Sequence, residues 1–162
     1  MKNNCSQIIS LFGIGYLSKY QGSIASLVVG FIWYVFIVLI QPDLIIQLIC
    51  VTIVIIISVI SINGYMLNSE KNDPEEIVID EACGIIISML FINYVSSSSG
   101  FIDNFAHFFI ALFIFRLLDG LKPSFIYRIQ ISNKPWAILT DDIIAGLITL
   151  AVVTSLRINL VI

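Results

Sequence analysis

Two long apolar runs constrain the fold of this chain more than any other feature. The runs Ile24–Ile40 and Leu44–Ile62 contain no charged residue, and only the short segment Gln41–Asp43 separates them. The hydrocarbon core of a bilayer, about 30 Å thick, requires roughly 20 apolar residues in a helix that crosses it. The two runs therefore predict a pair of membrane-spanning helices that form an antiparallel hairpin.

The composition of the whole chain agrees with a membrane protein. Of the 162 residues, 59% are hydrophobic and only 12% are charged, whereas soluble domains carry about 25% charged residues. This hydrophobicity excludes a disordered chain. Eight Lys and Arg residues against eleven Asp and Glu residues provide no basic surface, so we expect no nucleic-acid partner. We expect residues 1–162 to form a single membrane domain.

Three further apolar segments are shorter than the first two. They are Ala82–Val95, Asn104–Leu118 and Ile143–Leu156. Each segment can cross a bilayer if the helix tilts or extends at its ends, or it can lie in a bundle with one polar flank. The predicted fold is therefore all-α, a small integral membrane bundle with four or five membrane-associated helices.

The basic residues predict how the bundle is oriented. If Ile24–Ile40 leads out of the cytoplasm, the inner segments are residues 1–23, 63–81 and 119–142, and they hold six Lys and Arg residues. The outer segments Gln41–Asp43 and Ser96–Asp103 hold none, and only Arg157 opposes the pattern. Cytoplasmic loops are enriched in Lys and Arg. This orientation also gathers the unusual polar residues into one cluster at the cytoplasmic face.

Five carboxylates belong to this predicted cluster: Asp80, Glu81, Asp119, Asp141 and Asp142. The simplest interpretation is that they stabilise helix starts, with Asp80 capping one helix and Thr140 or Asp141 capping another. However, five unpaired carboxylates at one face would repel each other and raise each other's pKa. A divalent cation removes this conflict, and Mg²⁺ favours oxygen ligands together with phosphate oxygens.

Two cations accompany the acids on the segment that contains Asp119. Arg116, Asp119 and Lys122 are spaced three residues apart, which places them on one side of a helix. Basic residues at a cytoplasmic helix end commonly extend toward water and form a local salt bridge. Alternatively, the Arg fork and the Lys point charge bind a phosphate. Acids and cations together at a membrane surface favour phosphoryl chemistry on a lipid head group.

Four sequence blocks resemble those of the phosphatidylglycerophosphatase A family, in the same order and with similar spacing. The first block combines Gly13-Ile14-Gly15 with Gln21–Ser26, where Gln21-Gly22-Ser23 stands in place of the family's Pro-Gly-Thr. The other blocks are Ile77–Gly84, Phe115–Pro123 and Asp141–Gly146. The resemblance covers roughly residues 11–150, nearly the whole chain.

The resemblance implies an enzyme that removes the terminal phosphate of phosphatidylglycerophosphate to give phosphatidylglycerol, with Mg²⁺, in phospholipid biosynthesis. It implies a multi-pass protein of the bacterial inner membrane, with a phospholipid substrate and a cytoplasmic active face. The implied catalytic residues are Asp80, Glu81, Arg116, Asp119, Lys122, Asp141 and Asp142. Among these, Asp80, Glu81, Asp141 and Asp142 would hold the metal or orient water, and Asp119 would position Lys122 or join the metal ligands. Gly22, Ser23, Arg116 and Lys122 would bind substrate. The alternative function is a non-catalytic membrane protein, namely a transporter, a partner subunit or an inactive relative, whose acids bind a cation.

Overall fold

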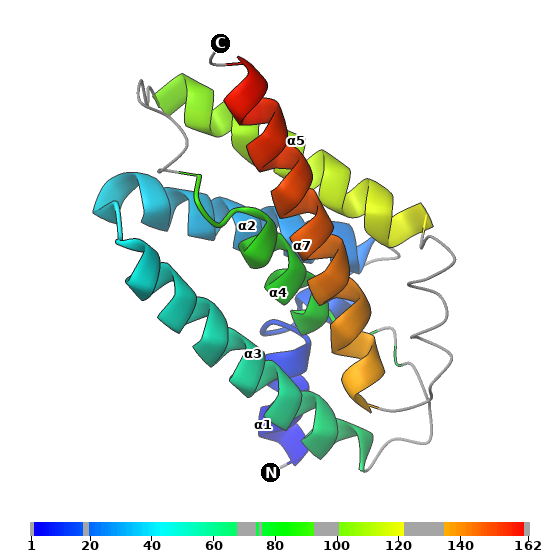
Figure 1. Ribbon diagram of the computed structural model, residues 1–162. Helices are drawn as coiled ribbons and strands as arrows, with labels where there is room; N and C mark the ends of the chain where they lie inside the picture. Colours follow the sequence, from blue (N-terminus) through cyan, green and yellow to red (C-terminus); the bar gives the residue numbers. More distant parts are fainter. Residues whose placement is uncertain are drawn as a thin grey trace.

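The computed structural model describes residues 2–17, 20–67, 74, 76–92, 101–121 and 135–160. These residues form six α-helices and one short 3₁₀ helix, η1, and no strand (Figure 1). In chain order the elements are α1 (Lys2–Ile9), η1 (Ile14–Tyr16), α2 (Gln21–Ile40), α3 (Leu44–Met66), α4 (Ile79–Ser88), α5 (Phe101–Leu121) and α7 (Pro135–Leu160). The all-α prediction is confirmed.

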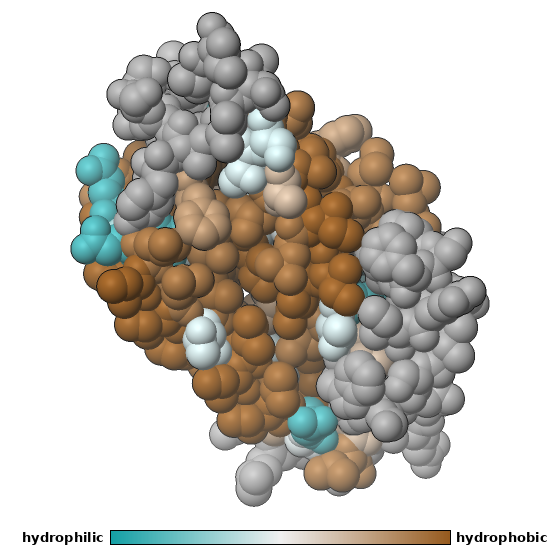
Figure 2. Space-filling model, viewed as in Figure 1, coloured by the Kyte–Doolittle hydropathy of each residue, from teal (hydrophilic) through white to brown (hydrophobic). Residues whose placement is uncertain are grey.

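Three stretches of the described residues are long and apolar enough to cross a membrane. They are α2, α3 and the part Ala137–Leu156 of α7. Large apolar side chains on these helices face outward, for example Ile32 and Ile45, and Figure 2 shows a surface that is largely hydrophobic over the described helices. In a bilayer this surface lies against acyl chains, so the bundle is a membrane protein.

The helices α2 and α3 are joined by the predicted tight turn but do not form a closely packed hairpin. At the turn, Gln41 adopts a left-handed backbone with φ 48°, and Gln47 Nε2 donates a hydrogen bond to the Pro42 carbonyl oxygen at 3.0 Å. Beyond the turn the two helices diverge, and α4 lies between them and contacts both (Figure 1). The two spanning helices and the turn between them are as predicted, and the structure adds that α4 separates them beyond the turn.

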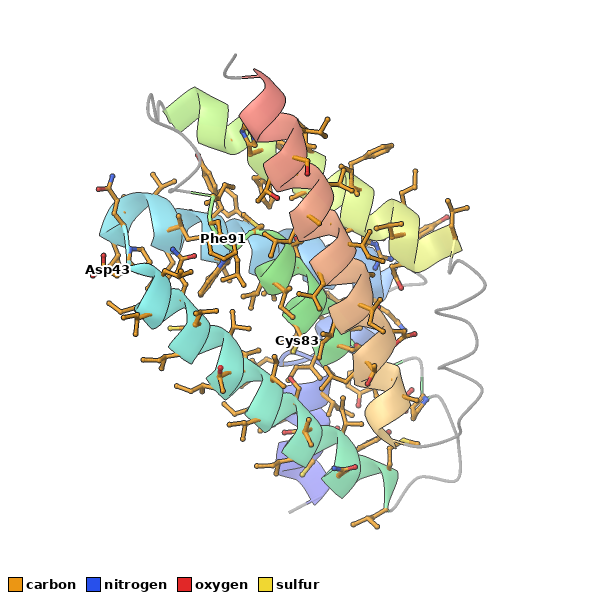
Figure 3. The ribbon with its side chains drawn as sticks, viewed as in Figure 1. Asp43, Cys83 and Phe91 are labelled. Carbon is orange, nitrogen blue, oxygen red and sulfur yellow. The ribbon has the colours of Figure 1, made fainter. Side chains whose placement is uncertain are left out.

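Helix α4 occupies the centre of the bundle. It has ten residues, about 15 Å of helix and half of a bilayer core. Helix α4 is therefore too short to cross the membrane and lies within the bundle, the second of the two arrangements left open for Ala82–Val95. Apart from Glu81, every residue of α4 is buried, because α2, α3, α5 and α7 all contact it. The Cys83 thiol, labelled in Figure 3, lies 3.1 Å from the Ser58 hydroxyl of α3. The apolar residues of this run face other helices instead of lipid.

Helix α4 ends inside the bundle with its last carbonyl groups satisfied. The Ser88 hydroxyl donates to the Ile85 carbonyl oxygen at 2.8 Å, and the Met89 amide donates to Ile86 at 3.3 Å. Phe91, labelled in Figure 3, then turns the chain with φ 66°. These contacts meet the requirement that backbone polar groups be paired where water is excluded.

The remaining predicted segments lie within longer helices. Asn104–Leu118 belongs to α5, which has 21 residues. Ile143–Leu156 belongs to α7, which begins at Pro135. Because α7 begins six residues before Asp141, neither Thr140 nor Asp141 caps it. The N-cap of α4 is Val78, so Asp80 does not cap α4 either. Asp80 and Glu81 therefore lie just inside the start of α4, whereas Asp141 and Asp142 lie well inside α7.

Candidate active site

Three carboxylates from two helices converge near the start of α4. Asp80 and Glu81 lie in the first turn of α4, and Asp142 lies in α7. One ligand oxygen of each residue lies within 4.8 Å of those of the other two. Asp80 is 9% exposed and Asp142 is 4% exposed, while the Glu81 side chain is 16% exposed. These three residues are called the acidic cluster below.

The close packing of α4 against α7 produces this convergence. A Cβ atom added to Gly146 of α7 would lie 2.5 Å from the Gly84 carbonyl oxygen of α4. A Cβ atom added to Gly84 would overlap the Phe115 ring and lie 2.8 Å from the Asp142 carbonyl oxygen. The two glycines let the helix backbones approach each other where their carboxylates meet. The sequence analysis gave no role to Gly84 or Gly146, although both stand at fixed places in the matched blocks.

Asp141 is the one predicted metal ligand that does not join the acidic cluster. It is 4% exposed, and its Oδ1 accepts a hydrogen bond from the Asp142 backbone amide at 3.2 Å. Neighbouring residues on a helix point about 100° apart, and only one carboxylate of the Asp141-Asp142 pair lies within 4.8 Å of both Asp80 and Glu81. In this structure Asp142 is that residue.

Arg116 of α5 lies beside the acidic cluster. Its Nη1 is 2.7 Å from Asp119 Oδ2 and 3.9 Å from Glu81 Oε1. Asp119, one turn further along α5, therefore pairs with Arg116 and stands outside the group of three converging carboxylates. The Arg116 side chain is 27% exposed. Lys122 lies outside the described residues.

The first turn of α2 closes another side of the site. Gly22 is buried there, and a Cβ atom on it would overlap the Glu81 carboxylate and lie 3.3 Å from Arg116 Nη1. Glycine at this position leaves the space in which the Glu81 and Arg116 side chains meet. Ser23 follows in the same turn and is half-buried.

The acidic cluster is electrostatically strained in the absence of a cation. Burial raises the pKa of the Asp80 carboxyl well above its usual value, and the neighbouring charges of Glu81 and Asp142 raise it further. Burial also raises the pKa of Glu81, and the Arg116 guanidinium partly offsets this. Asp80 Oδ1 and Glu81 Oε2 are buried without a hydrogen-bond partner among the described residues. Because buried oxygens without partners are unfavourable, these atoms are suited to bind a cation.

Comparison with known proteins places the chain in a family. Searches of curated proteins and of solved structures returned no match to this chain. A family model described as phosphatidylglycerophosphatase A matches residues 7–157 and so contains the acidic cluster, Arg116 and Gly22. The chain therefore belongs to the phosphatidylglycerophosphatase A family, a family of phosphatases.

Proposed function

We propose that this protein removes the terminal phosphate of phosphatidylglycerophosphate in a Mg²⁺-dependent reaction and thereby supplies phosphatidylglycerol to phospholipid biosynthesis. The observation that carries the proposal is the buried acidic cluster of Asp80, Glu81 and Asp142 with Arg116 3.9 Å from Glu81, in a chain that the family model matches. We further propose that residues 1–162 act as a single domain.

The residues of the acidic cluster fit Mg²⁺. They offer carboxylate oxygens only, the ligand type that Mg²⁺ prefers. Two of these oxygens are buried without a hydrogen-bond partner in the described part of the chain. When bound, Mg²⁺ activates water at neutral pH and neutralises charge on a phosphoryl group. Asp80, Glu81 and Asp142 would hold the ion, and Asp141 would fix the backbone of Asp142 through the hydrogen bond that it accepts.

Arg116 would bind the phosphate of the substrate. A guanidinium donates two parallel hydrogen bonds to phosphate oxygens, and the Arg116 side chain, 27% exposed, is more accessible than those of Glu81 and Asp119. Asp119 would hold the guanidinium in place from the next turn of α5. Lys122 would add a second positive charge, Gly22 would leave room for the phosphate group, and the Ser23 hydroxyl would donate to it. Binding of this kind stabilises negative charge that develops during phosphoryl transfer.

The head group would reach this site from one leaflet, while its acyl chains stay in the bilayer. The proposed side is the cytoplasmic face of a bacterial inner membrane, because the segments on the side of the site carry six Lys and Arg residues and the segments on the opposite side carry none, as is typical of cytoplasmic loops. A phospholipid substrate suits a site whose acids and Arg116 lie beside helices with outward-facing apolar side chains.

The test is phosphate release from phosphatidylglycerophosphate in detergent micelles, with Mg²⁺ and with excess chelator. Asp80→Asn should abolish release, while the matched variant Asp43→Asn should retain it, because Asp43 is exposed at the turn between α2 and α3 (Figure 3). Release that persists in chelator would contradict the role of the metal. A folded wild-type protein that releases no phosphate but binds Mg²⁺ would favour the non-catalytic alternative.

A further inference from the structure

A group of large side chains is exposed between α1 and α2. Phe12 is 87% exposed, Tyr16 60%, Leu17 67% and Tyr20 76%. These four residues precede α2 directly, within a span of nine positions. The described residues of this segment, 11–17 and Tyr20, are called the aromatic loop. So many exposed apolar side chains in one short loop indicate that this surface contacts a partner other than water.

The backbone conformation of the aromatic loop directs the Phe12 side chain outward. Leu11 and Phe12 adopt left-handed φ values of 47° and 56°, and Gly13 follows with 106°. Such values are rare for residues with a side chain. Hydrogen bonds maintain them: the Phe12 amide donates to the Gln7 carbonyl oxygen at 2.8 Å, and the Gly15 amide donates to Ser10 at 2.9 Å. The exposure of Phe12 is therefore a feature of an ordered loop.

The aromatic loop is also connected to the acidic cluster. The Val78 amide, two residues before Asp80, donates a hydrogen bond to the Ile9 carbonyl oxygen at 2.9 Å. Gly15 packs so closely on the Glu76 backbone that a Cβ atom there would overlap the Glu76 carbonyl oxygen. At its other end the loop leads into the turn of α2 that holds Gly22 against Glu81. The aromatic loop and the end of α1 that precedes it are therefore packed directly against the segment that leads into the acidic cluster.

The bilayer itself is the partner that fits this loop. The outward side chains of α2, such as Leu27 and Ile32, face acyl chains in a spanning helix, and the aromatic loop continues the chain from the end of that helix. Aromatic residues concentrate where a membrane protein crosses from hydrocarbon to head groups, because a tyrosine ring is apolar while its hydroxyl is polar. The Tyr16 hydroxyl lies 3.1 Å from the Ser6 hydroxyl, which leaves the ring exposed.

We propose that the aromatic loop is an interfacial anchor. Phe12, Tyr16, Leu17 and Tyr20 insert at the boundary between head groups and acyl chains, in the leaflet that faces the site. Through Ile9, Gly15 and Gly22 the anchor fixes the depth of the acidic cluster at the level where lipid phosphates lie. The partner is a lipid surface, and this role is distinct from binding the phosphate that is hydrolysed.

Tryptophan fluorescence tests the depth of the loop directly. Phe12→Trp is made in the full chain with Trp33→Phe and Trp136→Phe, and the protein is placed in phosphatidylcholine vesicles with brominated acyl chains. The expected result is blue-shifted emission, quenched more by bromine near the glycerol end of the chains than by bromine near the methyl end. Ile32→Trp is the matched control, because Ile32 is 62% exposed near the middle of the spanning helix α2 and should be quenched more by the deeper bromine.

Two fluorescence results would overturn the proposal. Red-shifted emission that aqueous iodide quenches would place Phe12 in water. Emission that neither bromine position nor iodide quenches would place Phe12 against protein, such as a second copy of this chain. This measurement requires no enzyme activity, so its failure is distinguishable from a failure of the proposed phosphatase function.

A kinetic measurement keeps the proposal testable if the tryptophan-free background does not fold. Phe12→Ser in the otherwise unchanged chain should raise KM for phosphatidylglycerophosphate in vesicles about fivefold, with kcat unchanged. The same variant should have the same KM as the wild type for a short-chain substrate in detergent, where no bilayer fixes the depth of the acidic cluster. Equal KM values for the variant and the wild type in vesicles would overturn the proposed anchor. An equal loss of kcat/KM in the vesicle and detergent assays would overturn it as well.

Discussion

Arg116 and Asp119 form an ion pair across one turn of α5, with 2.7 Å between Nη1 and Oδ2. The same nitrogen is 3.9 Å from Glu81 Oε1, so one guanidinium lies between a carboxylate of its own helix and one of the acidic cluster. Arg116 is the only Lys or Arg whose side chain the described residues include. The pair holds a positive charge beside acids that would otherwise repel an anionic substrate.

Replacement of Arg116 should separate the effect of charge from the effect of the guanidinium fork. Arg116→Lys keeps the charge but loses bidentate geometry, so kcat/KM should fall about 10- to 100-fold. Arg116→Gln removes the charge as well, and kcat/KM should fall about 1,000-fold. Phosphate release at saturating Mg²⁺ measures both. Equal activity of wild type and Arg116→Gln would exclude this residue from phosphate binding.

Gly22→Ala should impair the site through a single methyl group. The added Cβ atom would overlap the Glu81 carboxylate and crowd Arg116, so both side chains must shift. Because misplaced catalytic groups slow a reaction strongly, we expect kcat to fall about 100-fold. Gly120→Ala is the matched control, since a Cβ atom at Gly120 meets nothing within 4 Å among the described atoms. If the two alanine variants had equal activity, the described packing around Gly22 would be incorrect.

Gly146→Ala should separate α4 from α7. The new Cβ atom would lie 2.5 Å from the backbone carbonyl oxygen of Gly84, and neither backbone can shift without moving its helix. Overpacking of this kind destabilises a protein by about 1–3 kcal/mol, so thermal unfolding in detergent should occur at a lower temperature. The affinity for Mg²⁺ should fall in the same variant, because Asp142 moves away from Asp80. Unchanged stability and unchanged affinity would argue against close packing of the two helices.

The stability of the protein without metal should decrease as the pH rises. The raised pKa of Asp80 means that the folded protein retains a proton which the unfolded chain has already lost. The stabilisation that this retained proton provides is complete below the pKa of Asp80 in the unfolded chain, about 3.9. It is lost as the pH rises through the pKa of Asp80 in the folded protein. A bound cation replaces the proton, so Mg²⁺ should stabilise the protein more at about pH 8 than at about pH 5.

Thermal unfolding in detergent, with Mg²⁺ or with chelator at both pH values, checks this sign. Asp80→Asn should weaken the pH dependence of the chelated protein and the stabilisation by Mg²⁺. A chelated wild-type protein that is more stable at the higher pH would mean that the acidic cluster does not hold a proton in the way described.

The sequence was sufficient to predict the membrane helices α2 and α3 and to single out three acids that the structure brings together. Unbroken apolar runs long enough for a bilayer identified α2 and α3, and the motif blocks identified Asp80, Glu81 and Asp142, which the structure brings together. These features depend on local composition and on residue type, and both can be read along the chain.

The arrangement of α4 could not be predicted in the same way. An apolar run looks the same whether its residues face lipid or other helices, and the nearly complete burial of α4 depends on four helices that surround it. Likewise, residue type alone does not show that Asp142 joins Asp80 and Glu81 while Asp141 stays outside this group, because that depends on the rotation of α7. The role of Gly84 and Gly146 arises only from the contact between two helices.

We propose that Asp80, Glu81 and Asp142 together hold the divalent cation. Titration of the purified protein with Mn²⁺, followed by electron paramagnetic resonance, is the decisive experiment, because Mn²⁺ accepts the same oxygen ligands as Mg²⁺. The wild type and the control Asp43→Asn should each bind Mn²⁺ in a tight site from which Mg²⁺ displaces it. Asp142→Asn should lose that site together with phosphatase activity. Tight binding that persists unchanged in Asp142→Asn would contradict the account.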